Sequence, residues 1–157
     1  MRTRLFSAVL LLSLGASSPL LAQPPATKPA PTTSAPRSDR TLVYVLTTGL
    51  EDAQVMQSVF VHARVAAEQR RLREVVILVY GRGVFAFDGD IEARPPKLAE
   101  SIRQAMKAGV KIQVCGTALA HMGIDRKRLD PTPTEIVPQA TVTLVDYVAG
   151  GAAVVKY

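Results

Sequence analysis

The sequence has a single cysteine, no tryptophan and few aromatic residues, which make up 5% of its 157 positions. One cysteine excludes a disulfide bond within the chain. The chain has two histidines, and their spacing from the cysteine is not typical of a metal site. We therefore expect neither a bound metal nor another cofactor.

The formal net charge of +6 overstates the charge of the folded part. Residues 41–157 carry 14 basic and 12 acidic side chains, a net charge of +2. This part has no basic stripe interleaved with aromatic residues, so we do not expect it to bind nucleic acid.

The first 22 residues are typical of an export signal. Arg2 and Arg4 precede an uncharged apolar run from Leu5 to Leu14, and a stretch of small residues leads to Ala22, after which we place the cleavage site. Serine, glycine and proline interrupt the whole stretch from Leu5 to Ala22, which makes it a poor membrane span. We expect a periplasmic or secreted protein with no stable membrane span after cleavage.

Residues 23–40 contain five prolines and almost no large apolar side chain. Such a stretch cannot bury enough surface to offset the entropy of ordering it, so we predict a disordered linker. Residues 41–157 remain as one domain of ordinary length.

Strand and helix patterns alternate along this domain. The apolar runs 41–46, 75–80 and 110–114 predict strands that are buried on both faces, and shorter strands are expected at 135–137 and 152–157. Helical patterns cover 52–72, 95–106, 117–121 and 139–149, with prolines 95 and 96 opening the second helix. Thr48 is expected to cap the first helix with Glu51 as its partner. The alternation predicts a three-layer α/β fold: a mostly parallel sheet of about five strands with helices on both faces.

Ligands of such sheets gather at the carboxyl ends of the strands. Three loops lie there, and they supply the candidate pocket residues: Thr48 and Gly49, then Gly81, Arg82 and Gly83, and finally Cys115 with Gly116 and Thr117. The sequence GRGVFA at 81–86 matches a dinucleotide fingerprint only superficially, because the turn-like FAFDGD follows it where a helix should begin.

Cys115 lies between a strand end and a helix start, where backbone amides favour an anionic sulfur. A small buried cysteine would give the same sequence, since free cysteine is among the most buried residue types. His121 is the obvious candidate base, but six helical residues separate it from Cys115, and we expect it to face away.

Three segments carry a resemblance to a known family: VYVLTTGLEDAQ, VVILVYGRGVFAF and AGVKIQVCGTALAHMGI. Together with the closing GGAAVVKY, their order and spacing resemble the DsrE/DsrF-like superfamily, whose domains share the YchN-type α/β fold. The resemblance covers residues 41–157.

The resemblance implies a chemistry and an assembly. In the sulfur-relay members, a cysteine at the end of this strand carries a persulfide between partner proteins, and Cys115 matches its position. The implied protein is an exported sulfur carrier with donor and acceptor proteins, assembled as a homo-oligomer, a trimer or hexamer. In such an assembly His121 or Arg82 could reach the cysteine of another subunit. The alternative is a non-catalytic oligomeric module that binds a ligand or partner, with a structural cysteine.

Overall fold

A computed structural model describes residues 36–157. The predicted signal peptide and residues 23–35 of the predicted linker lie outside the described residues. Within the described part, no helix combines the length and the apolar character needed to cross a membrane.

Five parallel strands form one sheet. They are β1 (Thr41–Leu46), β2 (Glu74–Val79), β3 (Lys111–Cys115), β4 (Glu135–Val137) and β5 (Ala153–Lys156). Their order across the sheet is β4-β3-β2-β1-β5, and every neighbouring pair is parallel. The strands continue in one direction from β1 to β4, and the chain then returns to pair β5 with the free side of β1.

The three central strands hold the core. Residues 75–79 of β2 are all buried, as are Ile112 and Val114 of β3. A strand with helices over both of its faces has no solvent-facing side, so its side chains are apolar without alternation. The continuous apolar runs of the sequence therefore predicted these strands correctly.

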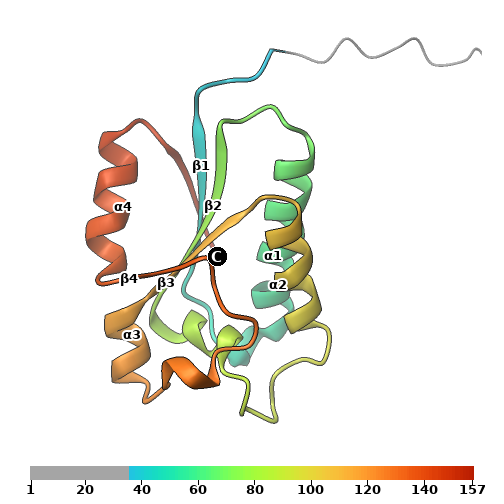
Figure 1. The fold of residues 1–157 in the computed structure, drawn as a ribbon, viewed down its shortest axis with the longest axis vertical. Helices are drawn as coiled ribbons and strands as arrows, with labels where there is room; N and C mark the ends of the chain where they lie inside the picture. The colour runs from blue at the N-terminus through green and yellow to red at the C-terminus, as the bar shows by residue number, and fades with distance from the viewer. Residues whose placement is uncertain (1–35) are drawn as a thin grey trace, which may run out of the picture. The chain divides into compact units, whose positions relative to one another are not determined.

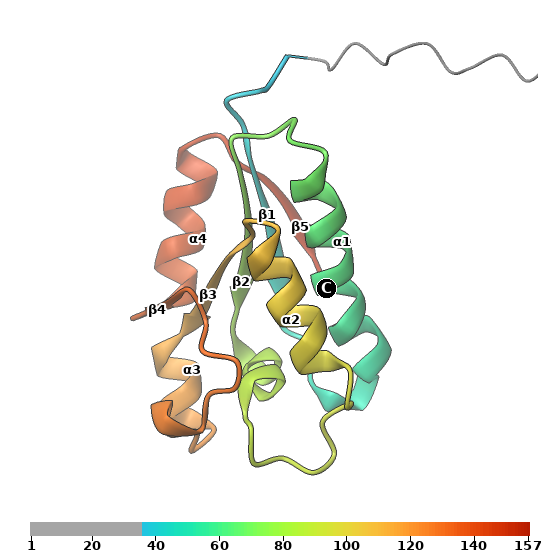
Figure 2. The same cartoon turned by 45° about the vertical axis from the view of Figure 1, so that its right-hand side comes forward.

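Helices cover both faces of the sheet (Figures 1 and 2). The helices α1 (Ala53–Glu68) and α2 (Leu98–Lys107) lie on one face, and α3 (Gly116–His121) and α4 (Ala140–Ala149) on the other. The predicted three-layer α/β fold with a sheet of about five strands is confirmed.

The start of α1 differs from the prediction. The chain first forms a 3₁₀ turn, η1 (Leu50–Asp52), and the side chain of Asp52 then caps α1 by accepting a 3.0 Å hydrogen bond from the amide of Val55. The predicted capping pair of Thr48 and Glu51 is therefore wrong. The extra turn moves the cap four residues along the chain, from Thr48 to Asp52, and the carboxylate of Glu51 turns back to the amide of Gly49.

Two other helix boundaries move for local reasons. The first helix ends at Glu68 rather than at residue 72, because Arg70 turns the chain with a left-handed φ of 53°. The second begins at Leu98 rather than at Pro95, with Lys97 as its N-terminal cap residue.

Arg70 occupies a backbone conformation that favours glycine or asparagine. Left-handed φ costs other L-residues roughly 1–2 kcal/mol. We predict that Arg70→Gly raises the free energy of unfolding by about 1 kcal/mol, part of the gain being offset by the larger entropy of unfolded glycine. Urea unfolding followed by circular dichroism measures the change.

The matched control is Arg71→Gly, which removes the same side chain at an exposed neighbour that is not among the described residues with positive φ. This variant is expected to lose stability. An Arg70→Gly protein no more stable than wild type would contradict the account of strain at Arg70.

Candidate functional site around Cys115

Cys115 is the last residue of β3 and the N-terminal cap residue of α3. Its extended backbone (φ −71°, ψ 116°) continues the strand and ends it where the helix begins. The residue is 6% exposed and belongs to the hydrophobic core. The sulfur therefore lies at the carboxyl edge of the sheet, as predicted, but just below the surface.

The amide of Ala140 donates a hydrogen bond to the sulfur of Cys115, with 3.4 Å between nitrogen and sulfur. Ala140 is the first residue of α4 and is itself buried. The first amides of a helix have no partner within the helix and carry its positive dipole end. This donor therefore directs a partial positive charge at the sulfur.

The segment between β4 and α4 is bound to the start of α3. The amide and the hydroxyl of Thr117 both donate to the carbonyl oxygen of Pro138, at 3.2 and 2.9 Å. Gly116 lies against the same segment, since a Cβ there would be 3.4 Å from the Val137 carbonyl oxygen. Gly116 and Thr117 thus hold the start of α4 over the sulfur.

The loops after β1 and β2 pack against each other. A Cβ on Gly49 would lie 2.8 Å from the Cβ of Arg82, and one on Gly83 would lie 2.5 Å from the carbonyl oxygen of Leu46. Gly81 turns the chain with φ 57°, and the 3₁₀ helix η2 (Gly81–Phe87) follows. These glycines allow close backbone approach and do not present side chains to a ligand.

Arg82 and Glu51 form an exposed ion pair across these two loops, with 2.9 Å between nitrogen and oxygen. The carboxylate of Glu51 also accepts a hydrogen bond from the amide of Gly49. The hydrogen bond from the Gly49 amide, then one from the backbone amide of Glu51 itself, and after these the Arg82 charge, hold the pKa of Glu51 below its usual value. The pair fixes the two loops to each other.

The predicted pocket residues therefore form two groups. Gly49, Gly81, Arg82 and Gly83 meet at the ends of β1 and β2, beside the half-buried Thr48. Cys115, Gly116 and Thr117 meet the start of α4 at the end of β3. Contacts between α3 and η2 join the two groups, whereas the polar contact of the sulfur comes from Ala140.

The two histidines lie on exposed positions. His121 ends α3 and faces solvent. His62 lies on α1, and its Nδ1 is 2.6 Å from the hydroxyl of Tyr157. Among residues 36–157, no three histidine, cysteine, aspartate or glutamate side chains gather as a metal site would require.

A polar contact not foreseen from the sequence holds α4 to the sheet. Gln113 points from β3 toward α4 and is 3% exposed. Its amide oxygen accepts from the hydroxyl of Tyr147 at 3.0 Å, and its nitrogen donates to Glu135 at 2.8 Å. Burial raises the pKa of Tyr147, so its hydroxyl stays a donor. A glutamine within the apolar run of β3 was the one sequence signal for this contact. Its partners could not be identified from the sequence, because they lie 22 and 34 residues further along the chain.

Ion pairs connect the loop that follows η2 with the segment around residues 128–130. The buried carboxylate of Asp88 accepts from Arg128 at 2.6 Å, where Arg128 ends the 3₁₀ helix η3 (Arg126–Arg128). Asp130 pairs with Arg94 at 3.0 Å and with Arg103 at 2.7 Å. The hydrogen bond from Arg94 is the first cause that lowers the pKa of Asp130.

The DsrE/DsrF-like family matches residues 41–157, the whole of the folded domain. The chain belongs to this family. None of the curated proteins compared with the chain matches it in sequence.

Solved structures share the fold of this DsrE/DsrF-like chain at low sequence identity. MTH1491 of Methanobacterium thermoautotrophicum, a protein of unknown function, superposes with a TM-score of 0.59 at 16% identity, over 76% of this chain and 100% of its own. BT1422 of Bacteroides thetaiotaomicron, also of unknown function, gives 0.60 at 15% identity, over 74% and 94%. YchN of E. coli gives 0.58 at 12% identity, over 76% and 100%. At these identities the similarity shows the fold alone.

The packing of the β1 and β2 loops gives a test by substitution. We predict that Gly83→Ala destabilises this DsrE/DsrF-like domain by about 1–3 kcal/mol, because its methyl group would meet the Leu46 carbonyl oxygen and the backbone must shift. Thermal unfolding measures the loss.

Gly116→Ala is the matched control, since its methyl group would make only ordinary contacts at 3.4 Å. It is expected to keep or raise the melting temperature, because alanine favours the helix. Equal losses in the two variants would refute the close approach at Gly83.

Proposed function

We propose that the protein is a sulfur carrier that holds a sulfane sulfur on Cys115 as a persulfide. The observation that supports this most directly is the hydrogen bond from the first amide of α4 to the Cys115 sulfur, at 3.4 Å. Membership of the DsrE/DsrF-like family associates the chain with sulfur relay in general. The position of the cysteine at the carboxyl end of β3 is where a parallel sheet gathers its chemistry.

The proposed loading step needs no external oxidant. The Cys115 thiolate attacks a sulfane sulfur of a polysulfide, and a new sulfur–sulfur bond forms while the adjacent one breaks. The shortened polysulfide leaves with the bonding electron pair, and Cys115 holds the persulfide anion. In the transfer step, a recipient thiolate attacks the outer sulfur and the Cys115 thiolate is released.

The Ala140 amide has a defined role in both steps. It donates to the anionic sulfur before loading, and the same donor faces the thiolate leaving group during transfer. A hydrogen bond to a developing anion is stronger than one to a neutral group. The amide belongs to a helix start, so it is already oriented toward the sulfur before the reaction.

The burial of Cys115 favours a second candidate function. At 6% exposure the sulfur packs among core side chains, as a structural cysteine does. In this alternative the protein is a non-catalytic module that binds a ligand or partner. The carrier function requires that a sulfur donor reach the nearly buried sulfur of Cys115, whereas the alternative requires no access to it.

We further propose that the carrier works outside the cytoplasm, in the periplasm or as a secreted protein. The sequence of residues 1–22 supports this, and it implies donor and acceptor proteins in the same compartment. A cysteine without a disulfide partner in an oxidising compartment must be protected or used chemically.

The first prediction from this function concerns sulfur loading. Protein purified without reductant and exposed to polysulfide is expected to gain the mass of one or more sulfur atoms, and reductant is expected to remove them. Cys115→Ser should gain none, because a hydroxyl does not form the disulfide-type bond. Intact-mass spectrometry measures both, and circular dichroism confirms that the variant is folded.

The burial of the sulfur makes the negative outcome informative. A thiol probe that reacts only after unfolding, together with no mass gain in the native protein, would end the carrier hypothesis and leave the binding module. Cys115→Ala provides the packing control, since it removes the sulfur without adding a buried hydroxyl that needs a partner.

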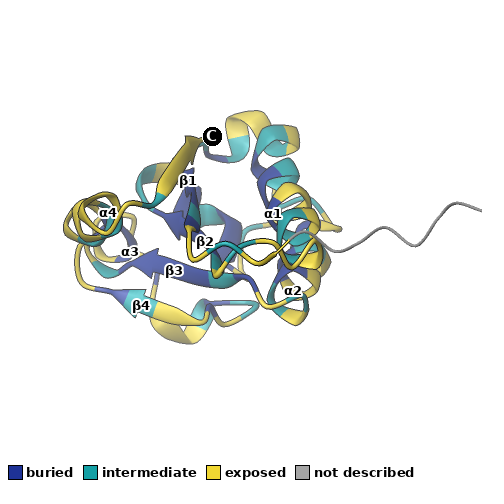
Figure 3. Cartoon of the chain, turned by 90° about the horizontal axis from the view of Figure 1, so that it is seen from above, coloured by how far each residue is buried: buried dark blue, intermediate teal, exposed yellow. Residues whose placement is uncertain are grey.

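We also propose that the protein assembles as a homo-oligomer. Exposed valines cover the outer side of α4 and both faces of β5: Val142, Val145, Val148, Val154 and Val155, each 40–61% exposed. Figure 3 shows α4 and the strand ending at the C-terminus as largely exposed. The valines of α4 recur every three residues and so lie along one side of the helix, and an exposed apolar surface of this kind marks an interface more often than a solvated face.

The charge pattern of this valine surface supports contact with another copy. Asp146 is the single charged residue of α4, and Lys156 is the single charged residue of β5. Among the strands of residues 36–157, none pairs with the edge of β5 away from β1, and natural proteins usually cover or charge such an edge.

The assembly is tested at the centre of the valine surface. Val145→Glu is expected to convert the oligomer into a monomer, because it places a charge in an apolar contact. Light scattering coupled to gel filtration measures the mass. Ala93→Glu adds the same charge at an exposed loop residue before α2 and should leave the assembly unchanged.

A wild-type protein that is monomeric at all concentrations would refute the assembly. An oligomer that survives Val145→Glu would place its interface elsewhere and would likewise contradict the role of this surface.

A further inference from the structure

A second candidate site lies at the opposite end of the sheet from Cys115. A cavity of about 750 Å³ opens at the amino ends of β2 and β3, beside the last turns of α1 and α2. Its volume lies in the range of small-molecule sites. About 13 Å of β3 separates Lys111 from Cys115, at roughly 3.3 Å per residue.

The lining of this cavity is strongly basic. It carries Arg37, Arg64, Arg70, Arg73 and Lys107 against Glu68 and Glu74. The described residues 36–157 contain 16 basic and 13 acidic side chains, a net charge of +3. The cavity lining alone has a net charge of +3, so the whole excess of the described part is concentrated there.

Few of these charges are neutralised within the described part of the chain. Arg64 pairs with Glu68 at 2.9 Å. Arg37 donates to the backbone carbonyl oxygens of Leu72 and Arg73, and Arg73 donates to the hydroxyl of Thr41. These acceptors are uncharged, and no carboxylate within residues 36–157 forms an ion pair with either guanidinium group.

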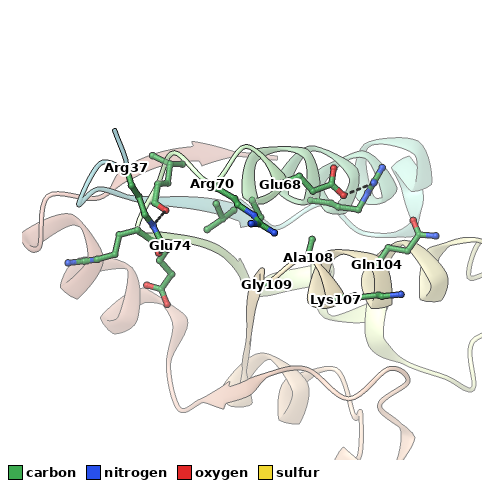
Figure 4. A pocket seen from close by; sticks show the side chains of 13 residues that line it. Arg37, Glu68, Arg70, Glu74, Gln104, Lys107, Ala108 and Gly109 are labelled. Carbon is green, nitrogen blue, oxygen red and sulfur yellow. Dashed lines mark hydrogen bonds and ion pairs between the residues drawn. The ribbon is translucent and has the colours of Figure 1, made fainter. Parts of the chain in front are cut away.

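The remaining two cations of the lining are Arg70 and Lys107. Among residues 36–157, neither Arg70 nor Lys107 forms an ion pair. Figure 4 shows Arg37, Arg70 and Lys107 spaced across the cavity rather than gathered at one point. Such spacing suits a ligand with more than one anionic group.

Helix ends explain only part of this charge. Cations are favourable at the carboxyl end of a helix, and Lys107 lies in the last turn of α2. The last turn of α1 has no basic residue, and Arg37 and Arg73 lie outside helices. Carbonyl oxygens in the last turns of α1 and α2 already accept hydrogen bonds from backbone amides, those of Gln69 and Ala108 respectively.

Arg70 keeps a long basic side chain at a strained position. Its φ of 53° would be easier for glycine or asparagine, yet the position carries an arginine that lines the cavity. Retained backbone strain is one sign of a functional role.

We propose that this cavity binds a small molecule carrying two or more phosphate groups. Guanidinium groups match the geometry of phosphate oxygens and bind them in pairs of hydrogen bonds. The positive charges that neutralise the phosphates come from four side chains of the lining: Arg37, Arg70, Arg73 and Lys107. One ligand with several anionic groups can contact several of them at once, so we expect it to bind better than a single small anion. The site is independent of sulfur chemistry at Cys115.

The experiment titrates the full chain with tripolyphosphate in a calorimeter, with sulfate as a dianion that has a single charged group. Tripolyphosphate is expected to bind, and sulfate to bind at least about tenfold more weakly, since a linked second group adds binding without a second association event. Hydrogen exchange measured with and without tripolyphosphate should show protection in residues 67–75 and 104–109.

The variants are Arg70→Asn, which suits the left-handed backbone, and Lys107→Gln. Each is expected to weaken tripolyphosphate binding by about fivefold or more, because each removes a charge-assisted hydrogen bond. Arg126→Gln removes the same charge from an exposed residue of η3, outside the cavity, and should change binding less than about twofold.

An equal loss in all three variants would mean that the anion responds only to the net charge of the protein, and it would overturn the proposal. No binding by wild type, tripolyphosphate bound no more tightly than sulfate, or protection outside the cavity would overturn it as well. Adenosine diphosphate, tested in parallel, separates an organic diphosphate from an inorganic chain: tighter binding assigns the site to organic phosphates, and weaker binding assigns it to inorganic ones.

Discussion

The packing of the three central strands between two helix layers is the interaction on which the rest of the structure depends. Residues 75–79 are buried on both faces of β2, which requires helices above and below the sheet. Because the strands are parallel, every connection must cross from one end of the sheet to the other. The two ends therefore acquire different characters: one holds Cys115 among close-packed loops, and the other holds the basic cavity.

The strands and the layering could be predicted from the sequence, because a strand that is buried on both faces appears as a short and nearly continuous apolar run. The helix α4 was harder, since its valines favour strands. Its helical state follows from position: it must carry the chain from β4 at one edge of the sheet to β5 at the other. Boundaries were less predictable, because Asp52, Thr48 and Glu51 all offer a side chain that can cap a helix.

The candidate site was predictable in part. The place of Cys115 at a strand end could be read from its neighbours in sequence, whereas its contact with Ala140 joins residues 25 positions apart. The basic cavity left no local signal, because its charged residues are scattered from Arg37 to Lys107. Only the return of α1 and α2 to the same end of the sheet brings them together.

The course of α4 has a mechanical consequence. Its first amide faces the Cys115 sulfur, and the helix leads to β5 at the far edge, with an exposed valine face along its length. The helix is a rigid rod joining the thiol to the outer surface. Any displacement of this helix along its axis therefore also moves the Ala140 amide relative to the Cys115 sulfur.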